Sequence, residues 1–140
     1  MENYNVYDFN GLGYKKLFHH QNWRVSILNY TEELEISQIS YVESHQHTDE
    51  VFVLIEGQCT IFFADVKDNQ ISSLEYLKLE KHKVYNISMN SFHTHTLSKD
   101  AKVLIIEEES TCDANSPKIH LDESTKILLK KSHMESLNEL

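Results

Sequence analysis

Apolar and β-branched residues occur along this chain in short runs separated by polar turns, a pattern typical of strands. In the segment 36–47, alternate side chains would share one face. The apolar runs 51–55 and 59–63 flank Glu56, Gly57 and Gln58, which predict a hairpin because glycine adopts positive φ readily. Other strand-like runs lie at 23–30, 74–79, 83–87, 93–97 and 102–107. Their spacing of roughly 8–12 residues favours an all-β sandwich or barrel.

The C-terminal part of the chain has a different pattern. A polar loop over 110–117 is followed by a candidate edge strand at 118–121, and Asp122 is then placed to cap the N-terminus of a helix that runs to about Leu137. The chain length fits one domain. We therefore predict a single domain over 1–140, with the barrel core at about 23–121 and a helical appendage at about 122–137.

Two of the predicted strands, at 51–55 and 103–106, are apolar on both faces. A strand with one face in solvent would carry polar residues at alternate positions, so both faces are expected to be covered. One face would line the barrel interior. The other would be covered either by a second subunit, which predicts a homodimer, or by the chain's own N-terminal strands and C-terminal helix.

Composition narrows the possible partners. The formal net charge of −9 disfavours binding to nucleic acids and to anionic membranes, since both require a positive surface. The N-terminus has no basic region followed by an apolar stretch, so no secretion signal is expected and the predicted location is the cytoplasm. In that compartment the two cysteines would be reduced thiols. A small-molecule ligand or substrate is the expected partner.

The candidate chemistry lies in a set of histidines and one glutamate. His45 and His47 stand two positions apart, so on a strand both would point inward, and Glu50 would begin the next strand. His93 and His95 repeat this spacing further along the chain. Histidine nitrogens with one carboxylate suit Fe(II), Mn(II), Ni(II) or Zn(II) and leave coordination positions open for a substrate.

This region resembles the first motif of the cupin superfamily, in which an HxH pair precedes a glutamate, and six intervening residues separate that glutamate from a glycine. Here Glu50 and Gly57 match the second half of that motif. The resemblance covers about residues 40–107 and is strongest to small single-domain bacterial cupins. It implies an antiparallel jelly-roll barrel. Of the family's second motif only the histidine, His93, is kept.

The metal half of the motif departs from the family pattern. Two residues separate His47 from Glu50, which is fewer than in the family, whereas the family spacing would make His45 and Glu43 the two members of the pair. Two ligand sets therefore remain open, and imidazole chemistry favours the first. They are His45, His47, Glu50 and His93, or Glu43, His45, Glu50 and His93.

Further residues are expected around this cluster. His95 could contact a ligand or orient one of the metal-binding histidines, and Tyr41 and Phe52 are predicted to form the pocket wall. We predict that the barrel binds a small polar molecule at a divalent metal ion. Isomerase, lyase or dioxygenase chemistry would all fit, and turnover itself stays open. The alternative is a metal-free barrel that binds or senses a ligand without catalytic turnover.

Overall fold

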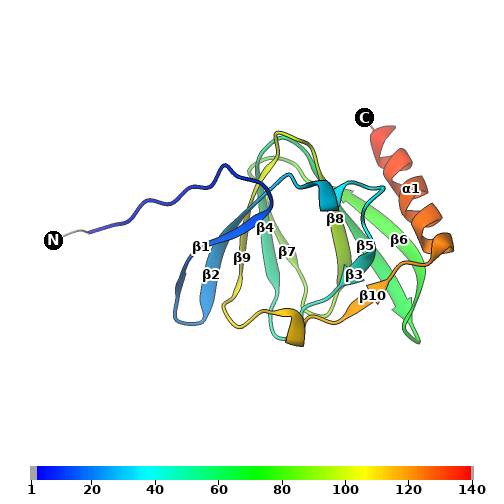
Figure 1. Cartoon of the computed structure of the whole chain (residues 1–140), viewed down its shortest axis with the longest axis horizontal. Coiled ribbons are helices and arrows are strands. Elements are labelled where there is room, and N and C mark those ends of the chain that lie inside the picture. Colours follow the sequence, from blue (N-terminus) through cyan, green and yellow to red (C-terminus); the bar gives the residue numbers. More distant parts are fainter. Residues whose placement is uncertain (1–2, 140) are drawn as a thin grey trace.

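The computed structural model describes residues 3–139, and its strands form two antiparallel sheets that face each other (Figure 1). The first sheet contains, in spatial order, β1 (Tyr14–His20), β2 (Trp23–Asn29), β9 (Lys102–Glu108), β4 (Glu50–Glu56) and β7 (Val84–Ile87). The second contains β10 (Lys118–His120), β3 (Tyr41–Glu43), β8 (Phe92–Leu97), β5 (Cys59–Lys67) and β6 (Gln70–Lys78). Two short 3₁₀ helices, η1 (Glu32–Leu34) and η2 (Asp113–Asn115), lie in the connections. The predicted all-β antiparallel barrel is confirmed.

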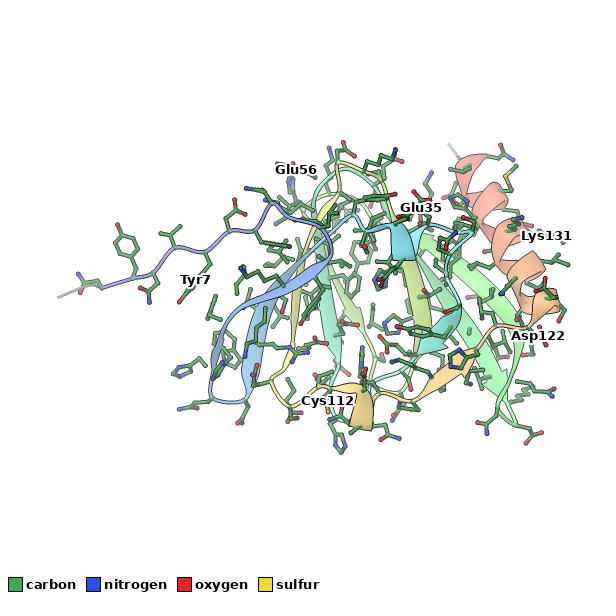
Figure 2. All side chains as sticks on the ribbon, viewed as in Figure 1. Tyr7, Glu35, Glu56, Cys112, Asp122 and Lys131 are labelled. Carbon is green, nitrogen blue, oxygen red and sulfur yellow. The ribbon has the colours of Figure 1, made fainter. Side chains whose placement is uncertain are left out.

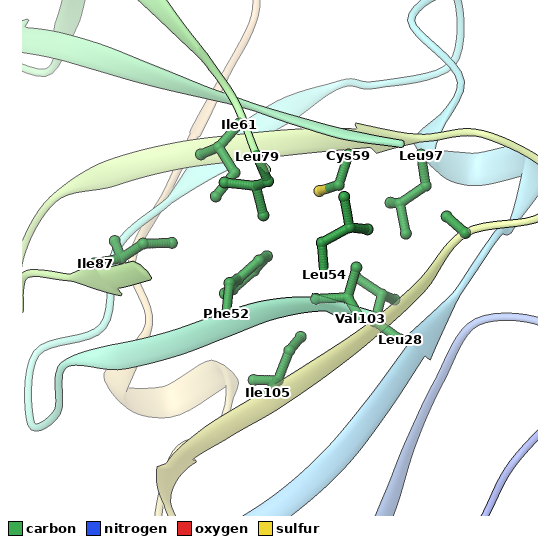
Figure 3. Close-up of a cluster of buried hydrophobic side chains, with 11 residues drawn as sticks. Leu28, Phe52, Leu54, Cys59, Ile61, Leu79, Ile87, Leu97, Val103 and Ile105 are labelled. Carbon is green, nitrogen blue, oxygen red and sulfur yellow. The ribbon is translucent and has the colours of Figure 1, made fainter. Parts of the chain in front are cut away.

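The hydrophobic core fills the space between the two sheets at one end of the barrel (Figure 3). Along β4, alternate residues are buried, and Phe52 and Leu54 point into this core. Val103 and Ile105 of β9 do the same. Each of these inward rows continues into a buried glutamate, Glu50 on β4 and Glu107 on β9, so the barrel interior changes from apolar to polar along its length.

The hairpin between β4 and β5 turns at Gly57, as the sequence predicts. Its φ is +73°, in the left-handed region that favours glycine. A Cβ atom at this position would lie 2.6 Å from Cα of Ala101, so the turn also needs the absence of a side chain. Gly57 therefore fixes how closely the β4–β5 turn approaches the segment before β9.

The predicted C-terminal helix is observed as α1 (Glu123–Leu137), with Asp122 as its N-cap (Figure 2). The Thr125 N–H donates to the Asp122 carboxylate at 2.9 Å. The helix packs mainly against β6 and buries Leu129 against the outside of the second sheet (Figure 1). No helix within residues 3–139 combines the length and the apolar composition that crossing a membrane requires.

Because α1 packs on the second sheet, it does not cover the outer face of the first sheet in the part of the chain that the structure describes. On this face Val51 and Val53 of β4 and Leu104 of β9 are half-buried, and Val84 of β7 is 71% exposed. Within residues 3–139 the C-terminal helix does not cover this face, and the N-terminal strands β1 and β2 extend the first sheet at its edge instead of lying across it. The covering by a second subunit stays a prediction.

The strands also begin earlier than predicted. β1 pairs with β2 at the edge of the first sheet, so strand structure starts at Tyr14 and not at about residue 23. Its sequence, YKKLFHH, lacks a clear alternation of apolar and polar residues because an edge strand buries little of either face. The segment before it is extended, and Tyr7 on it (Figure 2) stacks against Phe18 of β1 with 5.0 Å between ring centroids.

Candidate functional site

A cavity of about 780 Å³ opens between the two sheets on the polar side of the core. The residues predicted for the site that line it are Tyr41, Glu43, His45, Glu50, His93 and His95. Phe52, predicted as a wall residue, is instead fully buried in the core, where its ring packs edge-on against His95 with 5.3 Å between ring centroids. It lies behind the wall because it is one inward position beyond Glu50 on β4.

His45, Glu50 and His93 converge at the buried end of this cavity. His45 follows β3, Glu50 begins β4 and His93 lies on β8, so both sheets contribute to the group. Nε2 of His45 lies 3.3 Å from Oε1 of Glu50, and Nε2 of His93 lies 3.1 Å from the same oxygen. One ligand atom of each residue lies within 4.8 Å of the others, and all three side chains are buried.

The second ring nitrogen of each histidine has its own partner. Nδ1 of His45 lies 2.8 Å from the Ser116 hydroxyl, and Nδ1 of His93 lies 2.9 Å from the carbonyl oxygen of Ser91. A carbonyl can only accept, so Nδ1 of His93 donates to Ser91, and Nε2 faces Glu50 either with a proton or as a lone pair. A lone pair facing a carboxylate needs a positive charge between them, either a proton or a metal ion.

The pKa values of the group reflect this arrangement. Burial alone would raise the pKa of Glu50, but hydrogen bonds from His45 and His93 outweigh it and hold the pKa well below its usual range. Burial would lower the pKa of His45, yet the hydrogen bond and charge of Glu50 raise it above the ordinary value. Glu50 is therefore ionised, and His45 binds its proton more strongly than a free imidazole.

His95 differs from these two histidines. Burial, helped by the charge of His93, lowers the pKa of His95 to about 4, so the ring is neutral at ordinary pH. Its Nδ1 is buried and has no hydrogen-bond partner within residues 3–139. His95 also lines the cavity, so its neutral ring forms part of the wall beside the cluster.

The structure places the two candidates for the fourth metal ligand, His47 and Glu43, in different surroundings. His47 is exposed and lies outside the group, because β3 ends at Glu43 and residues 44–49 have no strand geometry. The expectation that strand alternation turns His47 inward is therefore wrong. Glu43 pairs directly with His93 across β3 and β8 and lines the cavity, and burial raises the pKa of its carboxyl.

Tyr41 lies two residues before Glu43 on β3 and is 36% exposed, at a more open part of the cavity wall. The Lys118 ammonium lies 4.9 Å from the centre of its ring. Burial raises the pKa of the Tyr41 phenol, so it stays protonated and can donate a hydrogen bond.

A second polar group, not found from the sequence, lines the cavity on the side of the first sheet. Arg24 Nη2 donates to Glu107 Oε1 at 2.7 Å, and the Tyr14 hydroxyl donates to the same oxygen at 3.0 Å. Burial and the charge of Glu50 raise the pKa of Glu107, although Arg24 opposes this rise. The feature of the sequence that could have revealed this group is Glu107 itself, a charged residue at an inward position of an otherwise apolar strand.

Together these features define a small cupin-type barrel with a buried histidine–glutamate cluster, and comparison with solved structures agrees with this fold. A cupin-2 domain containing protein from Shewanella frigidimarina superposes with a TM-score of 0.53 at 21% identity, over 72% of this chain and 85% of that chain. Pac13 from Streptomyces, described as a nucleoside dehydratase, superposes with a TM-score of 0.56 at 8% identity, over 84% and 87%. Protein NMB1881 from Neisseria meningitidis gives 0.51 at 11% identity, over 72% and 89%. The sequence matches no family model and no curated protein.

Proposed function

We propose that the barrel binds a small polar molecule at a divalent metal ion held by His45, Glu50 and His93. The observation that carries this proposal is the orientation of His93, because Nδ1 donates to the Ser91 carbonyl and Nε2 is thereby directed at Glu50, 3.1 Å away. Metal-binding histidines usually have such a partner on the second nitrogen. Two imidazoles and one carboxylate suit Fe(II), Mn(II), Ni(II) or Zn(II) and leave positions open for a ligand.

Glu43 is the residue best placed to complete this donor set. It lines the cavity next to His93, and its spacing to Glu50 fits the family motif better than that of His47. A bound ion would act as a Lewis acid on a coordinated oxygen. The chain's own groups would orient the ligand: Ser116 and Ser91 fix the two imidazole rings, and Glu43 can hold or release a proton at the cavity wall.

A metal-free barrel that binds or senses a small polar ligand is the second candidate. It is favoured by the short distances between Glu50 and both imidazoles, since a proton on either ring would satisfy the same geometry. The likeness to Pac13, a nucleoside dehydratase solved with uridine, agrees with a polar ligand in such a barrel but reflects the fold alone. The two candidates differ in what supplies the positive charge beside Glu50.

Elemental analysis of the full chain, purified without a histidine tag, separates them. After incubation with Fe(II), Mn(II), Ni(II) or Zn(II) and removal of the excess, we expect about one ion per chain in the wild type, the occupancy of a single mononuclear site. Glu50→Gln, which keeps the side-chain shape but removes the charge, should lose it, while His47→Ala should retain it. Wild-type protein that retains none of the four metals would contradict the metal site and favour the metal-free barrel.

A further inference from the structure

The Arg24–Glu107 pair makes fewer contacts than its chemistry allows. An arginine and a carboxylate can form two parallel hydrogen bonds, but here only Nη2 and Oε1 are joined. Nε of Arg24 and Oε2 of Glu107 are both buried and have no partner among residues 3–139. The pair therefore keeps one unused donor and one unused acceptor.

A third unused polar atom lies nearby. Oγ1 of Thr111 is buried without a partner in the described part of the chain, and the Thr111 carbonyl accepts from Arg24 Nη1 at 3.1 Å. Arg24, Glu107 and Thr111, which we term the polar subsite, all line the same cavity as the histidine cluster. Buried polar atoms normally have partners, so three unpartnered atoms on residues that line one cavity point to a ligand or to ordered water.

The charge of the cavity restricts what this ligand can be. Five carboxylate side chains line it, namely Glu33, Glu43, Glu50, Glu107 and Asp113, against the single guanidinium of Arg24, which is already paired. Without a metal ion the field inside is therefore negative and repels anions. A carboxylate or phosphate also offers only acceptors and would meet Oε2 of Glu107 unfavourably, whereas an ammonium offers only donors and would meet Arg24.

We propose that the polar subsite binds an uncharged group that both donates and accepts hydrogen bonds, such as the hydroxyls of a polyol or sugar. This inference rests on the proposed function in one respect: the same ligand would reach from the polar subsite to the histidine cluster. The cavity thus selects neutral hydroxyl-bearing molecules over their carboxylate or phosphate counterparts. Arg24 supplies the donor, Glu107 the acceptor, and Thr111 adapts to either.

Matched probe pairs test this selectivity in the full chain. The pairs are ribose with ribose 5-phosphate, and uridine with uridine 5′-monophosphate, each titrated to millimolar concentration into ¹⁵N-labelled protein. The readout is the ¹H–¹⁵N signal of Arg24 Nε. A neutral probe should shift this signal and bind about tenfold more tightly than its phosphate partner, the effect expected for one hydrogen bond with a charged group. If neither neutral probe shifts the signal, so that only water occupies the polar subsite, or if the phosphates bind as tightly, the proposal is overturned.

Glu107→Gln provides a second test, because it replaces the unused acceptor by a donor and removes one negative charge. This variant should lose the preference for the neutral probes, while Glu108→Gln, on the opposite face of β9, should keep it. An unchanged preference in a folded Glu107→Gln protein would contradict the role of Glu107. Should this variant fail to fold, the titrations of the wild type with the probe pairs alone decide whether the polar subsite prefers neutral ligands.

The same titrations on zinc-loaded and on chelator-treated protein separate this inference from the proposed function. If the neutral probes shift the Arg24 signal in protein that binds no metal, the polar subsite is supported and the metal site is contradicted. If the protein binds one metal ion per chain but binds the phosphate probes as tightly as the neutral ones, the metal site is supported and the polar subsite is contradicted.

Discussion

Glu50→Gln offers the sharpest test of the histidine–glutamate cluster, measured as metal-dependent thermal stabilisation. Glu50 is the only member of the group that brings a negative charge to the ion, and both imidazoles contact its Oε1. Losing a residue that only orients a ligand typically costs 10–100-fold in metal affinity, so losing this ligand should cost at least about 100-fold. With free metal at about 100 times the wild-type Kd, the wild type gains about 2.7 kcal/mol and the variant only about 0.4 kcal/mol.

These free energies convert into melting temperatures through the size of the chain. An unfolding entropy of roughly 2.1 cal/mol/K per residue gives about 0.3 kcal/mol/K for 140 residues. Added metal should thus raise Tm by about 9 °C in the wild type and by about 1.5 °C in Glu50→Gln. Differential scanning fluorimetry with and without a chelator measures both values.

Two further variants make this result specific. Ser116→Ala removes the partner of His45 Nδ1 and should give an intermediate shift, whereas His47→Ala, at an exposed position, should behave as the wild type. Equal shifts in the wild type and Glu50→Gln, or loss of the shift in His47→Ala, would refute the assignment of the ligands.

Three other predictions concern the turn, the pH dependence and the assembly. Gly57→Ala should lower the free energy of unfolding in chemical denaturation by at least about 2 kcal/mol, because it combines a left-handed φ with a contact at 2.6 Å. Gly13→Ala is the control: its φ is +81° but its nearest contact is at 4.0 Å, so it should cost only about 1 kcal/mol. Without metal, the His45–Glu50 pair stabilises the fold fully below the pKa of about 6.5 that His45 has in the unfolded chain, and this stability is lost as pH rises through the raised pKa of folded His45. In zinc-loaded protein the free energy of unfolding should instead rise with pH, because protons compete with the ion for the ligands. Parallel dependences of the free energy of unfolding on pH in the two forms would contradict the metal site. Light scattering should give twice the 16.4-kDa chain mass, and Val53→Glu on the uncovered face of the first sheet should give a monomer, whereas a monomeric wild type would refute the dimer.

The strands that build the core could be predicted because their sequence pattern matches their surroundings. The predicted strands at 51–55 and 102–107 correspond to β4 and β9, whose inward positions are apolar on one side of the molecule and glutamate on the other. The N-cap at Asp122 likewise marks the start of α1. β1 could not be predicted this way, because an edge strand with little burial has no strong periodic pattern.

The site was predictable where its residues lie within the sheets, and at His45, which follows β3 and still faces the cavity. Glu50 and His93 occupy strand positions, and alternation turns both inward. His47 lies in the segment between β3 and β4, where the two-residue period does not apply, so the same rule misplaced it. Arg24 and Glu107 meet through the pairing of β2 with β9, and a register between strands so distant in sequence cannot be derived from local patterns.

The pairing of β4 with β9 also explains why this end of the barrel is suited to bind a ligand. Phe52 pairs with Ile105 and Val51 with Ile106, so continuing the same register by one residue sets Glu50 opposite Glu107. Two buried carboxylates side by side repel each other, and burial penalises the charge on each, so neither is explained by stability of the fold alone. The flanking groups compensate them separately: the two imidazoles face Glu50, and Arg24 faces Glu107. The core residues of the same two strands form a rigid apolar base that holds the two carboxylates together. This is the arrangement expected where a fold gives up local stability to preorganise a polar site.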